Sequence, residues 1–281
     1  MKPAQYLSFA LLFTFPLVEA GAVEKDVSGV ISFNTIAPTN SDIANWTTGW
    51  GTAGVTGWNY VGTVNGASGV YLGNNWVLTA GHVGAGTFSL SGTSYSVVAG
   101  SVQGILNTDG TPVDLTLFRL TLAPNLPSLT VASSAPVAFS QSQGGSSVAM
   151  IGYGGGQGQT WGLNTATQID QSIFLSGYGY TSTDFVTDYG SFGHGPSSFT
   201  NNYTLIVGDS GGADFIFDST ASKWVLSGIN EAVDSNKNSY LVELSAYASQ
   251  INSITAAVPE PSSFGLLGLG LLALLFKRPK S

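Results

Sequence analysis

Between residues 49 and 256 the chain alternates apolar and polar positions in short runs, which are interrupted by glycine, asparagine and proline. An alternation with a period of two is typical of β-strands that bury one face. In GVYLGNNWVLTAGHV it predicts two strands, residues 69–72 and Trp76–Thr79, which form a hairpin around a Gly-Asn-Asn turn. The alternation continues in TFSLSGTSYSVVAGSV and TPVDLTLFRL, so this half of the chain is predicted to be a β subdomain.

A second set of strands follows a segment that is rich in proline, serine and glycine. We interpret this segment, residues 124–142, as a connection. The strands after it begin at SSVAMIGYGGG and include YTLIVGDSGGADFIFD, KWVLSGIN and SYLVEL. Apolar residues then recur at helical spacing in Leu244–Thr255, which predicts a short C-terminal helix. The pattern as a whole predicts an all-β protein of two β subdomains closed by this helix.

The first 22 residues have the layout of a secretory signal peptide. Lys2 precedes an apolar stretch at residues 7–18, and small residues follow up to Ala22. Cleavage is expected after Ala20 or Ala22. The alternative is a membrane anchor, but the apolar stretch is too short to span a bilayer. We therefore expect residues 1–22 to direct export.

The C-terminal segment, residues 258–281, combines VPEP, an apolar run at residues 264–276 and a basic end, KRPKS. As a helix the run would reach about 20 Å, short of a hydrocarbon core of about 30 Å. The segment resembles the PEP-CTERM sorting signal of Gram-negative bacteria. That resemblance implies transient membrane contact, removal by an exosortase-type enzyme, and a destination between the periplasm and the cell surface or extracellular matrix. The alternative is a plain C-terminal anchor with its basic end inside; the PEP at residues 259–261 favours sorting.

Composition narrows the chemistry that the protein can perform. The 281 residues carry a formal charge of −8, which argues against nucleic acid as a partner. The chain has no cysteine, which excludes disulfides, cysteine nucleophiles, iron–sulfur centres and thiolate zinc sites. With two histidines, a histidine-rich metal site is excluded as well. We therefore expect neither a metal nor another cofactor.

The stretch VGDSGGADF places an acid, a hydroxyl and three glycines within residues 208–212. A serine hydroxyl needs an adjacent base to act as a nucleophile, and a carboxylate then holds the histidine in the correct tautomer. His82 ends an apolar strand in WVLTAGH, and Asp114 begins the apolar DLTLFRL. The competing interpretations are a buried core histidine and a strand-edge acid. His194 in SFGHGPSS is the rival base, although a histidine between glycines is more typical of a solvated loop.

LTAGH, DLTLFRL and GDSGG, in that order, resemble the His, Asp and Ser motifs of the chymotrypsin-like (trypsin-like) serine peptidases. The similarity covers roughly residues 49–256, and MIGYG at residues 150–154 resembles the segment that opens the second barrel in that family. The resemblance implies two six-stranded antiparallel β-barrels, at residues 49–140 and 141–257. Residues 23–48 then form an N-terminal segment before the first barrel.

The resemblance also implies roles for individual residues. Ser210 would attack the scissile carbonyl, His82 would move the proton, and Asp114 would orient His82. The backbone N–H groups of Gly208 and Ser210 would bind the oxyanion, and Asp209 would shape the loop from behind. An exported serine endopeptidase acting on proteins or peptides is the function expected. The alternatives are a catalytically inactive relative that serves as a binding or adhesion module, and a structural matrix protein.

Two further expectations come from the resemblance. It places Thr204 at the floor of the substrate pocket and Glu231, Ala232 and Val233 along its wall. A threonine cannot form the ion pair that selects Arg or Lys, so small or medium apolar side chains are the expected preference. In zymogen-type members an activating cut frees an apolar N-terminus that pairs with the acid at the position of Asp209. This chain has no basic site followed by Ile-Val-Gly-Gly, so the sequence leaves the activation route open.

Overall fold

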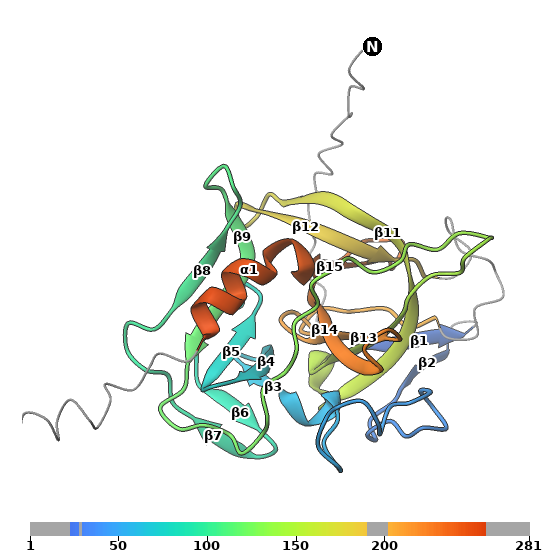
Figure 1. Ribbon diagram of the computed structural model, residues 1–281. Helices are drawn as coiled ribbons and strands as arrows, with labels where there is room; N and C mark the ends of the chain where they lie inside the picture. Colours follow the sequence, from blue (N-terminus) through green and yellow to red (C-terminus); the bar gives the residue numbers. More distant parts are fainter. Residues whose placement is uncertain (1–22, 28–29, 190–201, 257–281) are drawn as a thin grey trace, which may run out of the picture.

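The computed structural model describes residues 23–27, 30–189 and 202–256. It contains two large antiparallel β units side by side, with one α-helix lying against both of them (Figure 1). The predicted all-β architecture is therefore confirmed. The signal peptide, the sorting segment and His194 were predicted in parts of the sequence that lie outside the described residues.

The first unit is a seven-stranded antiparallel sheet in the order β7-β6-β3-β4-β5-β9-β8. Its strands are β3 (Val61–Val64), β4 (Ala67–Gly73), β5 (Trp76–Thr79), β6 (Phe88–Leu90), β7 (Thr93–Tyr95), β8 (Gln103–Leu106) and β9 (Pro112–Arg119). The predicted hairpin is confirmed as β4 and β5. Asn74 and Asn75 turn the chain there with φ angles of 50° and 67°, a conformation that asparagine tolerates better than most residues.

This first sheet differs in detail from the six-stranded barrel that the resemblance implies. It has seven strands, and its two edge strands, β7 and β8, do not pair with each other to close a ring. The chain just after β7 nevertheless returns to the end of β9, where Val97 and Leu120 form an isolated bridge. The N–H of Val98 also donates to the carbonyl of Arg119 at 2.8 Å. The sheet thus curls so that the chain after β7 meets the end of β9.

The second unit is a closed six-stranded barrel in the order β10-β11-β12-β15-β14-β13. Its strands are β10 (Ser147–Gly152), β11 (Thr160–Leu175), β12 (Tyr180–Thr187), β13 (Ala213–Asp218), β14 (Lys223–Val233) and β15 (Ser239–Glu243). Register shifts occur in the β11–β12, β13–β14 and β14–β15 pairs. Such irregularities bend strands and help a sheet to close.

The predicted C-terminal helix is confirmed as α1 (Leu244–Thr255). It buries Leu244, Tyr247, Ala248 and Ile251, which lie three or four residues apart on one helical face. The side chain of Gln250 donates to the carbonyl of Leu106 in β8 at 2.8 Å, so the helix ties the barrel to the first sheet. Within the described ranges, no helix has both the length and the hydropathy needed to cross a membrane.

The N-terminal segment packs against the barrel. It begins with a hairpin of β1 (Glu24–Val27) and β2 (Val30–Phe33). Glu24 forms an isolated bridge with Thr204, which precedes the Ser210 turn. The 3₁₀ helices η1 (Gly57–Tyr60) and η2 (Gly154–Gly156) lie in the connections. Trp46 is fully buried and contacts the rings of Trp50, Phe215 and Trp224 edge to face. One hydrophobic core therefore joins this segment to both β units.

Candidate active site

His82 and Asp114 come together because β5 and β9 are adjacent antiparallel strands. Thr79, the last residue of β5, pairs with Thr116 in β9. The chain that continues past Thr79 therefore turns beside the start of β9, where Asp114 lies. Strand register alone brings residues 32 positions apart into contact.

Asp114 holds His82 through both of its carboxylate oxygens. Oδ1 accepts the backbone N–H of His82 at 2.7 Å, and Oδ2 lies 2.6 Å from Nδ1 of the ring. Asp114 is fully buried, while 11% of the His82 side chain is exposed. A Cβ atom on Gly81 would approach Oδ1 of Asp114 to 3.0 Å, which explains a glycine before the histidine. The contact fixes the orientation of the ring and leaves Nε2 free of Asp114.

The electrostatics of this contact favour the charged form of His82. Burial of the ring lowers the pKa of His82, because it penalises the imidazolium. The hydrogen bond to Asp114, and then the charge of Asp114, act in the opposite direction. The net result is a pKa of His82 above its ordinary value. A histidine stabilised in this way can accept a proton during a reaction.

Ser210 lies in a tight turn whose glycines are required by the backbone. Gly208 and Gly211 have φ angles of 99° and 80°, in the left-handed region that other residues avoid. A Cβ atom on Gly211 would also collide with the carbonyl oxygen of Ser68. The N–H of Ser68 donates to the carbonyl of Ser210 at 2.9 Å, so the turn is attached to β4 of the first sheet.

Two backbone N–H groups in this turn have no protein acceptor among the described residues. Within the described part of the chain, neither the N–H of Gly208 nor that of Ser210 donates to a protein acceptor, whereas the N–H of Asp209 donates to Ile206. Free backbone N–H groups beside a serine hydroxyl can bind a developing negative charge.

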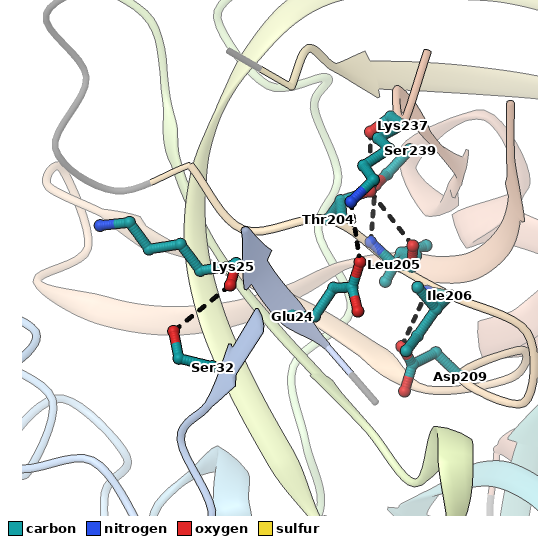
Figure 2. Close-up of polar contacts among 9 residues, drawn as sticks. All are labelled: Glu24, Lys25, Ser32, Thr204, Leu205, Ile206, Asp209, Lys237 and Ser239. Carbon is teal, nitrogen blue, oxygen red and sulfur yellow. Dashed lines mark hydrogen bonds and ion pairs between the residues drawn. The ribbon is translucent and has the colours of Figure 1, made fainter. Parts of the chain in front are cut away.

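Asp209 supports the turn from the buried side. Its carboxylate accepts the N–H of Gly154 at 2.9 Å and the N–H of Ile206 at 3.1 Å, and the N–H of Val23 also donates to it. Burial raises the pKa of Asp209 to about 7, against the lowering effect of these hydrogen bonds. Figure 2 shows Asp209 and Ile206 beside the strand that carries Glu24.

A cavity of about 390 Å³ opens between the two β units at this point. Its lining includes His82 and Ser210 together with Leu175, Tyr178, Leu205, Val207, Glu231, Ala232 and Val233. The predicted wall residues are thus all at the cavity. Thr204, predicted at its floor, is not part of the lining. It is buried, and its hydroxyl donates to the carbonyl of Lys237 at 2.7 Å (Figure 2).

The structure places Ser210 and His82 at one cavity without a direct bond. Among the described residues, the His82 ring hydrogen-bonds to Asp114 and not to the Ser210 hydroxyl. Bonds between a nucleophile and its base are often long in ligand-free enzymes and shorten when a substrate binds.

Sequence reasoning missed two residues of the site. Tyr178, in the turn between β11 and β12, lies over His82 with ring centroids 4.9 Å apart and is 60% exposed. Ser182 in β12 accepts the N–H of Asp114 at 3.2 Å. Both residues come from the second barrel, and no local pattern connects them to the first. The available signal was the segment TSTDFV, residues 181–186, where a polar run that ends in an acid leads into apolar strand residues.

Comparison with known families gives two matches. The trypsin model matches residues 49–252, which include His82, Asp114 and Ser210. The model of the PEP-CTERM protein-sorting motif matches residues 257–278, and this motif indicates export and cell-surface sorting in Gram-negative bacteria. No curated protein matches the sequence.

Several solved protease structures are similar to the chain at low identity. The inactive form of the Rv3671c protease of M. tuberculosis is 19% identical, with 71% of this chain and 91% of that chain covered and a TM-score of 0.49. The HtrA-type protease AlgW is 20% identical, with 68% and 52% covered and a TM-score of 0.46. The NS6 protease of murine norovirus 1 is 14% identical, with 68% and 93% covered and a TM-score of 0.42.

Proposed function

The chain belongs to the trypsin family of serine peptidases, and on that premise we propose that it is an exported serine endopeptidase with His82, Asp114 and Ser210 as its catalytic residues. The observation that carries the proposal is the double contact of Asp114 with His82 at the cavity that Ser210 also lines. Its substrates are proteins or peptides, in keeping with the family.

In the proposed reaction, a substrate carbonyl binds in the cavity beside Ser210. Nε2 of His82 removes the proton of the hydroxyl as Oγ attacks the carbonyl carbon. Asp114 stays ionised and stabilises the imidazolium that forms. His82 then gives the proton to the leaving amine, which departs and leaves an acyl group on Ser210. Water, activated by the same ring, hydrolyses this ester and restores the serine.

The free N–H groups of Gly208 and Ser210 would bind the oxyanion of the tetrahedral intermediate. As far as the described residues go, neither group has to break a protein hydrogen bond first, which favours stabilisation without reorganisation. Loss of one such donor costs about 10²–10³ in turnover in enzymes of this kind.

The contact between Val23 and Asp209 suggests how the mature enzyme begins. Val23 is fully buried, and its N–H donates to the buried carboxylate of Asp209. If the signal peptide is cut after Ala22, that nitrogen becomes an α-ammonium group and pairs with Asp209, as the resemblance to zymogen-type relatives implies. Glu24 supports this placement, because it pairs with Lys237 at 3.1 Å (Figure 2). We propose that removal of residues 1–22 during export yields the active form.

The sorting motif gives the proposed enzyme its route. An exosortase-type enzyme would remove the C-terminal segment after its transient contact with the membrane. The mature enzyme would then act between the periplasm and the cell surface or matrix.

Labelling with a fluorophosphonate tests the activity directly. We expect the probe to modify Ser210 of the mature protein, as located by mass spectrometry, and Ser210→Ala to abolish labelling. Ser219→Ala, at an exposed turn serine, is the matched control and should label like the wild type. A folded mature protein that takes up no label would instead support the binding or adhesion module.

A further inference from the structure

Ser182 connects Asp114 to a second acid, Glu231. The hydroxyl of Ser182 accepts the backbone N–H of Asp114 at 3.2 Å and donates its own hydrogen to Oε1 of Glu231 at 2.7 Å. All three residues are buried, on β9, β12 and β14 respectively. A hydroxyl has a single hydrogen, and that of Ser182 is directed at Glu231, so Oε1 of Glu231 acts as the acceptor.

Three oxygens next to this bridge lack a donor. Within the described residues, both carboxyl oxygens of Asp184 and Oε2 of Glu231 are buried with no N–H or O–H group directed at them. The two carboxyl groups nevertheless contact each other closely enough for a hydrogen bond. Two ionised carboxylates cannot form one, but a single proton between them supplies the missing donor.

The surroundings favour the neutral form of the Glu231 carboxyl over an ionised form beside Asp184. Burial, and then the neighbouring Asp184, raise the pKa of Glu231 well above its ordinary value. Burial likewise raises the pKa of Asp184. The titratable groups that face the pair from neighbouring elements are His82, Asp114, Asp214, Tyr240, Glu243 and Tyr247. Most of them are acids or phenols, so they oppose a second negative charge.

We propose that Glu231 is a positioning residue of the active site, held neutral by a proton that it shares with Asp184 and joined through Ser182 to the backbone of Asp114. The consequence concerns His82. An ionised Glu231 would place a second negative charge beside the His82–Asp114 contact and would hold more of the base in its protonated, inactive form. The shared proton keeps that charge on Asp184, which is fully buried and does not line the cavity.

The test measures the pKa of His82 by NMR in a His194→Ala background, where His82 is the only histidine. Asp184→Asn removes the partner but keeps a donor, so the charge should move to Glu231 and raise the pKa of His82 by about half a pH unit or more. Glu231→Gln replaces the neutral acid by a neutral amide of the same shape and should leave the pKa of His82 close to the wild-type value.

Other charge states give different patterns. If both acids were ionised, each single variant would lower the pKa of His82. If both were neutral, Asp184→Asn would leave it unchanged. Either result overturns the proposal. Should Asp184→Asn fail to fold, Glu231→Gln decides alone, because a fall in the pKa of His82 would mean that Glu231 carries charge.

A second measurement uses the rate of fluorophosphonate labelling. This measurement rests on the proposed function, whereas the pKa measurement does not. Fluorophosphonate labelling of Asp184→Asn should need a higher pH than that of the wild type. Glu231→Gln should label at least about ten times faster than Glu231→Ala, since the amide still accepts the hydrogen of Ser182. Equal rates for these two variants would contradict the positioning role. If the pKa of His82 follows the expected pattern but neither the wild type nor any variant is labelled, the shared proton is upheld and the proposed peptidase activity is refuted.

Discussion

Asp114 accepts two hydrogen bonds from one residue, the backbone N–H of His82 and its ring nitrogen Nδ1. The first bond fixes where the chain turns after β5, and the second fixes the tautomer and direction of the ring. The position of the base and the direction of its ring thus depend on a single buried carboxylate, which makes this residue pair an informative target for mutation.

Asp114→Asn should keep the fold and lose about four orders of magnitude in turnover, because an amide favours the wrong tautomer of His82. Peptide hydrolysis by the purified mature protein measures the loss.

His82→Ala should abolish fluorophosphonate labelling, and His194→Ala should leave it intact. The reverse result for the two histidines would show that the base has been assigned to the wrong residue.

The pH dependence follows from the raised pKa of His82. Only the neutral ring accepts the serine proton, so labelling should rise with pH and reach half its maximum above the ordinary histidine value of 6.5. The folding stability that the His82–Asp114 pair contributes changes in the opposite direction, because it falls as the pH rises. The stabilisation from the charged His82–Asp114 pair is complete below pH 6.5 and is lost as the pH rises through the raised pKa. A labelling midpoint below 6.5 would contradict the assignment.

The cavity predicts a preference for small or medium apolar side chains. Ala232 and Val233 narrow it, and the carboxyl of Glu231 is engaged by Ser182. Val233→Gly should enlarge the space and shift kcat/KM toward larger apolar side chains by about tenfold, while Val233→Leu should oppose that shift. Profiling with a peptide library provides the measurement. Cleavage mainly after Arg or Lys would refute the preference.

The proposed mature N-terminus can be tested with two chains, one starting at Val23 and one retaining Gly21 and Ala22. The longer chain has no ammonium group beside Asp209, so it should label more slowly and melt several degrees lower. Asp209→Asn is the control and should remove most of the difference between the two lengths. Sequencing of the exported protein should give Val23 as its first residue; a different start would exclude this pairing.

The sorting motif predicts a shortened C-terminus in the native host. Mass spectrometry of the surface protein should find an end near residues 258–263. An intact basic end at residues 277–281 on the mature protein would indicate a plain anchor.

Much of the architecture could be read from local sequence. The β4–β5 hairpin has a period of two on each side of an Asn-Asn turn, and α1 has apolar residues at helical spacing. Both elements depend on contacts between near neighbours, which the order of residues specifies directly. The motifs around His82, Asp114 and Ser210 were also visible, because each is a short run of adjacent residues.

Tertiary structure alone decided the contacts between distant segments. It added a seventh strand to the first sheet and left Thr204 outside the cavity lining, with its hydroxyl bonded to the carbonyl of Lys237. It also brought Val23 to Asp209 and Ser182 to Asp114. These pairs are set by strand order and by the docking of the two β units. Side-chain periodicity tells which face of a strand is buried, but it does not tell which strand lies against that face.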